Sequence, residues 1–135
     1  MTVTYKTTKT IDIEQLRALY TDVQWTAYTQ DETVLKAIVP NALHVISAWS
    51  DDELVGLTRA VGDGVYILYI EDILVKEAYQ GKGIGSTLLQ KMLEANQMVR
   101  QTVLMTDYQD KTIQFYEKNG FTKADNEKTG IAFVR

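Results

Sequence analysis

The sequence predicts a single α+β domain in which helices flank a central β-sheet, and three observations support this class. The chain has 135 residues, which is enough for one domain with a substantial core. Residues 65–75 form a nearly unbroken apolar run, which is typical of a central strand covered on both faces. Strand-like and helix-like patterns alternate along the chain, without repeats, linkers or low-complexity segments.

The first sixty residues predict three strands and two helices from the period of their apolar side chains. The strands are predicted at residues 2–9, 43–50 and 54–61, and the helices at residues 12–23 and 31–39. Asp12 is suited to cap the first helix, and the last two strands form a hairpin across Asp51 and Asp52. Trp25 and Tyr28 lie between the helices in a turn-like setting.

The second half predicts further strands and helices after a tight turn at residues 62–64. They are the central strand at 65–75, a helix at 84–98, a strand at 102–106, a helix at 111–119 and a short last strand at 131–134. Gly120 follows the last helix directly and is suited to its C′ position. The single His44 lies in an alternating strand pattern, which favours an ordinary strand residue over a functional one.

The loop between the central strand and the next helix contains three glycines, in Gln80-Gly81-Lys82-Gly83-Ile84-Gly85-Ser86. Glycines allow a backbone to approach a ligand closely, and the helix that follows points free N–H groups into the loop. This arrangement suits a phosphate. A Walker A loop is excluded because Ser86 stands where its second glycine belongs, and a dinucleotide fingerprint fails at the same residue.

The spacing that fits is Gln/Arg-x-x-Gly-x-Gly, in Gln80, Gly83 and Gly85, and here the chain resembles the GNAT family of N-acetyltransferases. Residues 115–121, Phe-Tyr-Glu-Lys-Asn-Gly-Phe, are similar to a second motif of that family. The resemblance covers residues 69–121, with Glu77 near the place of the usual proline. It implies one N-acetyltransferase domain over residues 1–135, built on a central mixed, mostly antiparallel sheet flanked by helices.

The resemblance also implies acetyl-CoA as the acetyl donor. The loop would hold the pyrophosphate of CoA, and the pantetheine arm would lie along the end of the central strand, with the N–H of Ile73 polarising the thioester carbonyl. Phe115 would line the cofactor channel or pack in the core. The implied cofactor-binding residues are Ile73, Val75, Gln80, Gly81, Lys82, Gly83, Ile84, Gly85, Ser86 and Phe115. The family's Asn-x-x-Ala pattern is not met, since Gln109 and Thr112 occupy its positions.

Two residues are predicted to move protons. An amine acceptor with a pKa near 10.4 is neutral in only about one molecule in 10³ at pH 7, so a base is required. Glu71 and Asp72 interrupt the apolar strand, and Glu71 matches the base position of the polyamine-acetyltransferase branch. Since adjacent strand residues face opposite ways, Asp72 is expected to have a structural role, bonded to loop backbone. Tyr116 matches the family tyrosine that protonates the departing thiolate.

Composition excludes several other classes. The chain has no cysteine and one histidine, which excludes a cysteine nucleophile and a His- or Cys-rich zinc site, and no metal is expected. A net charge of −4 disfavours nucleic acid as a partner. No apolar run is long enough to span a membrane and no signal-peptide pattern opens the chain, so we expect a cytoplasmic enzyme.

The acceptor stays open: a polyamine-like molecule, an aminoglycoside, an amino acid or a peptide would each supply a primary amine. The alternative is a catalytically inactive acyl-CoA-binding sensor or interaction module, which would keep the loop without needing Glu71 or Tyr116. Transfer to an oxygen, or of a longer acyl chain, also stays open. Homodimers are common in the family, but the sequence shows no interface signature.

Overall fold

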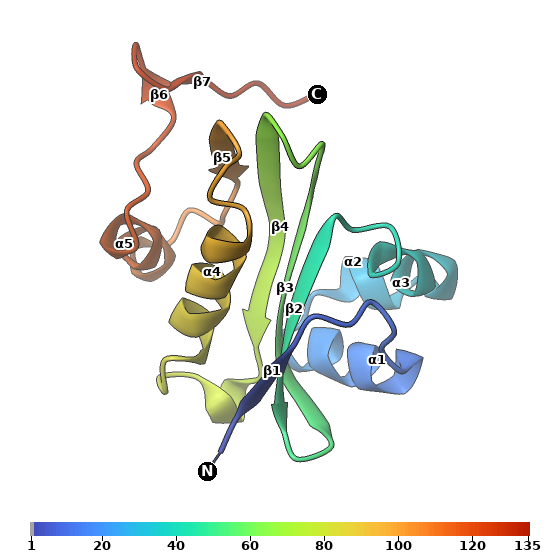
Figure 1. Ribbon diagram of the computed structural model, residues 1–135. Coiled ribbons are helices and arrows are strands. Elements are labelled where there is room, and N and C mark those ends of the chain that lie inside the picture. Colours follow the sequence, from blue (N-terminus) through green and yellow to red (C-terminus); the bar gives the residue numbers. More distant parts are fainter. Residues whose placement is uncertain (1) are drawn as a thin grey trace. The chain divides into compact units, whose positions relative to one another are not determined.

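The computed structural model describes residues 2–135, which form two compact units, one ending at Leu104 and one of Met105–Arg135. The first unit holds a five-stranded sheet in the order β1-β2-β3-β4-β5 (Figure 1). Its strands are β1 (Thr4–Lys6), β2 (His44–Ser50), β3 (Glu53–Gly62), β4 (Ile67–Val75) and β5 (Gln101–Leu104). Its helices are α1 (Ile13–Asp22), α2 (Thr26–Thr29), α3 (Glu32–Ile38), the 3₁₀ turn η1 (Glu77–Tyr79) and α4 (Ile84–Ala95).

The sheet is mixed and mostly antiparallel. Strands β1, β2, β3 and β4 pair antiparallel with one another in this order, and β4 pairs parallel with β5. Helices α1, α2 and α3 lie on one side of the sheet, and α4 lies on the other (Figure 1). Within residues 2–135 no helix is long and apolar enough to cross a membrane. The fold class predicted from the sequence is therefore confirmed.

The register assigns the side chains of β3 and β4 to these two sides. On the α4 side, Gly56 pairs with Val75, and a Cβ atom at Gly56 would lie 3.2 Å from the side chain of Leu88 in α4. On the other side, Leu57 pairs with Leu74, and both belong to the core cluster that includes Leu16, Leu19 and Leu35 of α1 and α3. A glycine at position 56 thus allows α4 to pack closely against the sheet.

The two early helices begin where the sequence predicts them, because each has an aspartate cap. The carboxylate of Asp12 accepts from the N–H groups of Glu14 and Gln15 at 3.1 and 3.3 Å. Asp31 accepts from Thr33 and Val34 at 2.9 and 3.4 Å. The four-residue helix α2 was not predicted, since it has no side-chain cap and too few residues to show a helical period.

Other bounds differ from the prediction by a few residues at element ends, where local signals are weak. The first strand is confined to Thr4–Lys6, β4 begins at Ile67, and α4 ends at Ala95 with Asn96 at its C-cap. Strand β5 ends at Leu104 rather than at residue 106.

The second unit contains α5 (Asp110–Lys118) and a two-stranded ribbon of β6 (Asp125–Asn126) and β7 (Gly130–Ile131). The helix ends in a Schellman motif, in which Phe121 N–H donates to Tyr116 O at 3.0 Å and Gly120 N–H to Glu117 O at 3.1 Å. Gly120 has a φ of +93°, which confirms its predicted C′ role. The predicted strand at 131–134 is wrong beyond Ile131, because the only partner in the ribbon is the two-residue β6.

Candidate functional site

The glycine loop has the backbone geometry that a phosphate cradle requires. Gly81 and Gly83 have φ values of +77° and +84°, a region that other residues adopt only with strain. A Cβ atom at either position would meet nothing within 4 Å, so protein packing does not explain the two glycines. They combine a left-handed backbone with open space, which leaves the loop free to approach a ligand.

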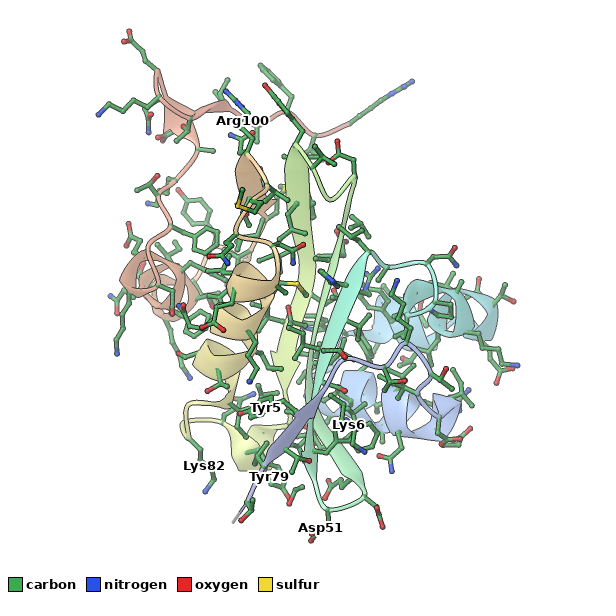
Figure 2. All side chains as sticks on the ribbon, in the orientation of Figure 1. Tyr5, Lys6, Asp51, Tyr79, Lys82 and Arg100 are labelled. Carbon is green, nitrogen blue, oxygen red and sulfur yellow. The ribbon has the colours of Figure 1, made fainter. Side chains whose placement is uncertain are left out.

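Helix α4 starts directly from this loop, with Gly83 as its N-cap, so no side chain of the cap residue accepts from the first N–H groups of the helix. Its first intrahelical bond joins Thr87 N–H to Gly83 O at 3.0 Å. The N–H groups that precede it, on Ile84, Gly85 and Ser86, therefore point out of the helix at the positive end of its dipole. A bound anion would satisfy them. The Lys82 side chain extends outward from the same loop (Figure 2).

The end of β4 leads into this loop and leaves one backbone edge open. Strand β5 pairs only with Ile67–Ile70 of β4. Beyond Ile70, residues 72–75 pair with β3 on one side, and among residues 2–135 no strand pairs with residues 71–75 on the other. Gln80 Nε2 donates to Val75 O at 2.9 Å, which fixes the loop to the strand end. An extended ligand could add to the edge at Ile73, as the sequence predicts.

Glu71 lies at an irregularity in β4. Arg59 pairs with Asp72 and Ala60 pairs with Ile70, so Glu71 has no partner on β3 and forms a β-bulge. Its side chain is exposed, whereas Ile70 and Asp72 on either side are buried. The bulge also breaks the strict alternation of faces on which the sequence argument relied. A carboxylate that is solvated next to the open strand edge is suited to accept a proton.

Asp72 is wholly engaged by side chains. Its Oδ2 accepts from Tyr20 Oη and from Arg59 Nε, both at 2.8 Å, and its Oδ1 accepts from Tyr28 Oη at 2.8 Å. The expectation that Asp72 bonds loop backbone is wrong, because the donors come from α1, α2 and β3, far from it in the sequence. The buried, triply bonded carboxylate is not available as a base, which leaves Glu71 as the candidate of the pair.

These contacts shift the pKa values of the groups around Asp72. Burial, and then the charge of Asp72, raises the pKa of Tyr28 to about 12 and raises that of Tyr20 further. Burial alone would lower the pKa of Arg59, but the adjacent Asp72 raises it overall. Both phenols therefore stay neutral and Arg59 stays charged at any physiological pH.

Trp25 and Tyr28 belong to the same cluster. The ring centroids of Tyr20 and Tyr28 lie 4.7 Å apart, and that of Trp25 lies 6.1 Å from Tyr20. The Arg59 guanidinium lies over the ring of Tyr28 in a cation–π contact, with its Cζ 5.7 Å from the ring centroid. The aromatic residues thus pack with a cation of the protein itself. Sequence reasoning missed Arg59, although a lone arginine within the apolar run 54–61 was a usable signal.

The second unit holds the other predicted residues, Phe115 and Tyr116, on α5. Their ring centroids are 5.0 Å apart in an edge-to-face arrangement, and Tyr116 lies 5.9 Å from Phe121 in the same geometry. Burial, followed by the charge of Asp107, raises the pKa of Tyr116 to about 12. The phenol is therefore a protonated hydrogen-bond donor throughout the neutral and mildly alkaline range.

Comparison with known proteins agrees with this geometry. A family model described as "Acetyltransferase (GNAT) domain" matches residues 9–135. The chain belongs to the GNAT family of acetyltransferases. The family model spans the loop, β4 and α5, and so includes every residue of the candidate site. The protein is accordingly an N-acetyltransferase by family, as the two sequence motifs indicated.

Individual relatives support the assignment. A GNAT-family acetyltransferase from Streptococcus pneumoniae is 31% identical, with a TM-score of 0.81 over 99% of this chain and 98% of that one. An uncharacterized ycf52-like N-acetyltransferase from Prochlorococcus marinus is 28% identical over 90% of this chain and 68% of its own length. The PaiA N-acetyltransferase of Thermoplasma acidophilum, solved with coenzyme A, shares the fold at a TM-score of 0.73 and 19% identity, over 96% of this chain and 95% of that one. This GNAT chain is therefore shorter than its curated relative but close in length to the solved structures.

Proposed function

We infer that this GNAT protein transfers the acetyl group of acetyl-CoA to the primary amine of a small molecule or peptide, directly and within a ternary complex. The observation that carries the proposal is the loop Gln80–Ser86, with two left-handed glycines facing open space and an uncapped helix start. The family model covers residues 9–135, which supports one acetyltransferase domain made of both compact units.

The loop would hold the CoA pyrophosphate through the N–H groups of residues 81–86, with Lys82 adding a positive charge. The pantetheine arm would extend along the open edge of β4 at Ile73 and Val75. The N–H of Ile73 would meet the thioester carbonyl, while Val75 O already accepts from Gln80 Nε2. A donor there would stabilise the negative charge that develops on the carbonyl oxygen.

In the transfer step, the amine nitrogen attacks the thioester carbon, an N–C bond forms and the C–S bond breaks. Glu71 would accept the proton of the amine, directly or through a water molecule. Tyr116 would donate a hydrogen bond to the departing sulfur. Full proton transfer from a phenol of pKa about 12 to a free thiolate of pKa about 8.5 is uphill by about 5 kcal/mol. Tyr116 therefore acts mainly by stabilising the thiolate, which collects its proton on leaving.

The proposal is tested by measuring the release of free CoA with a thiol reagent. The background is low because the chain has no cysteine that would react with the reagent. Acetyl-CoA should be incubated with spermidine, an aminoglycoside, lysine and a lysine-containing peptide in turn. We expect at least one amine to accelerate CoA release. Binding of acetyl-CoA without release for any amine would favour the inactive sensor, and absence of binding would overturn the assignment of the loop.

Two substitutions test the proton transfers. Glu71→Gln should lower kcat by about 10²–10⁴-fold at pH 7. The defect should shrink towards pH 10, where about a quarter of an amine with a pKa near 10.4 is already neutral. Tyr116→Phe should lower kcat while the Kd for acetyl-CoA changes little. If Glu71→Gln lowers kcat by the same factor at pH 7 and pH 10, Glu71 is not the base. If Tyr116→Phe keeps the kcat of the wild type, Tyr116 has no role in the mechanism.

A further inference from the structure

The bulge at Glu71 determines whether this side chain is buried or exposed. If Arg59 kept its pairing with Asp72 and β4 were regular, Glu71 would pair with Ala60. Ala60 is fully buried on the α4 side, so the carboxylate would be turned into an apolar layer. The extra residue in β4 instead leaves Glu71 exposed.

The residue after the bulge is anchored more strongly than its neighbours. The side chains of Asp72 and Arg59 are only 2% and 9% exposed, and they form a direct ion pair. Thr58 Oγ1 also donates to the backbone oxygen of Asp72 at 3.0 Å. Asp72 is thus fixed at both its side chain and its main chain, directly beside the bulge.

Tyr20 and Tyr28 extend this anchor to the helices. They donate the remaining two hydrogen bonds to Asp72, and Arg59 Nη2 donates to Tyr28 Oη at 3.1 Å. Every buried side-chain polar atom has a partner among the described residues, so the cluster is complete. Buried ion pairs add little net stability compared with apolar packing, and their best-attested role is to select one register. A strand with a bulge depends on such selection, because its register with β3 must shift by one residue at Glu71.

We propose that Asp72, held by Arg59, Tyr20 and Tyr28, is a positioning residue that maintains the β4 bulge and thereby keeps Glu71 exposed to solvent as the base for acetyl transfer. The catalytic part of the proposal rests on the proposed function of Glu71. Its structural part, that the cluster maintains the bulge, stands independently of activity.

Tyr28→Phe tests the cluster without breaking the ion pair. It removes the donor to Asp72 and the acceptor of Arg59 Nη2, and it retains the ring packing. The matched control is Tyr66→Phe, the same change at an exposed tyrosine just before β4. Both variants would be made in the full chain, with and without Glu71→Gln. The measurements are kcat and the KM for acetyl-CoA, with the best amine of the panel above, and amide hydrogen exchange of residues 70–73.

We expect Tyr28→Phe to lower kcat by about tenfold, less than the roughly 10² of a 1 Å displacement, with an unchanged KM for acetyl-CoA. In the Glu71→Gln background the same change should have no further effect on kcat. Amide exchange at residues 70–73 should accelerate in Tyr28→Phe and not in Tyr66→Phe.

An equal loss of kcat with and without Glu71 would show that Tyr28 acts through general stability, and would overturn the positioning role. Unchanged exchange at residues 70–73 would overturn the structural part. If the wild type acetylates no amine, the proposed function fails, and the exchange measurement alone still decides whether the cluster maintains the bulge.

Discussion

Replacing Arg59 with methionine should destabilise the protein far more than breaking an ordinary surface ion pair. The substitution keeps most of the side-chain volume but leaves the carboxylate of Asp72, only 2% exposed, without a cation. Coulomb's law with an effective dielectric constant of 20 gives about 6 kcal/mol for unit charges 2.8 Å apart. Two effects reduce this loss: the charge of Arg59 no longer has to be buried, and two tyrosines still donate to Asp72. We therefore expect the free energy of unfolding to fall by about 3–5 kcal/mol.

Urea unfolding followed by tryptophan fluorescence measures the loss, since the chain has two tryptophans. Natural domains have unfolding free energies of about 5–15 kcal/mol, so the expected change is a large fraction of the total. Lys76→Met is the matched control. Its partner Glu53 is 45% exposed, and we expect a loss of at most about 1 kcal/mol. An Arg59→Met loss no larger than that of the control would refute the reasoning about the buried pair.

Two further predictions concern helix capping and alkaline pH. Asp12→Ala removes the acceptor for Glu14 and Gln15 N–H and should lower the free energy of unfolding by about 1 kcal/mol; no change in urea would show that the cap does not stabilise α1. The raised pKa values of about 12 mean that folded Tyr28 and Tyr116 keep protons which the unfolded chain releases near pH 10. The stability they provide is complete below pH 10 and is lost as the pH rises to about 12. Absorbance titration at 295 nm should show tyrosines that ionise above pH 10 in the folded protein and near pH 10 in urea. Identical titration curves for the folded and the unfolded chain would contradict this.

Local signals in the sequence predicted most of the fold. Asp12 and Asp31 marked helix starts, Gly120 marked a helix end, and the glycine spacing located the loop between β4 and α4. Each of these signals depends on residues a few positions apart. The same locality explains the failures at α2 and at the last strand, where the segments are too short to show a period.

The candidate site was predictable to the same extent. Gln80–Ser86 lie in one continuous loop, so their spacing alone revealed it. The environment of Asp72 was not predictable, because Tyr20 and Tyr28 precede it by 52 and 44 residues and meet it only through the tertiary fold. The bulge at Glu71 was missed for a related reason. It depends on the pairing register with β3, and the apolar pattern of β4 does not show it.

Calorimetric titration with acetyl-CoA tests most directly whether the glycine loop is the CoA site. The wild type should bind one acetyl-CoA per chain, and Gly83→Glu should abolish the binding by placing a bulky anion at the start of α4. Gly130→Glu is the matched control, since Gly130 has a similar φ of +75° and equally open surroundings outside the loop. We expect this control to bind normally. A wild type without binding heat, or a Gly83→Glu variant that binds acetyl-CoA as tightly as the wild type, would contradict the account.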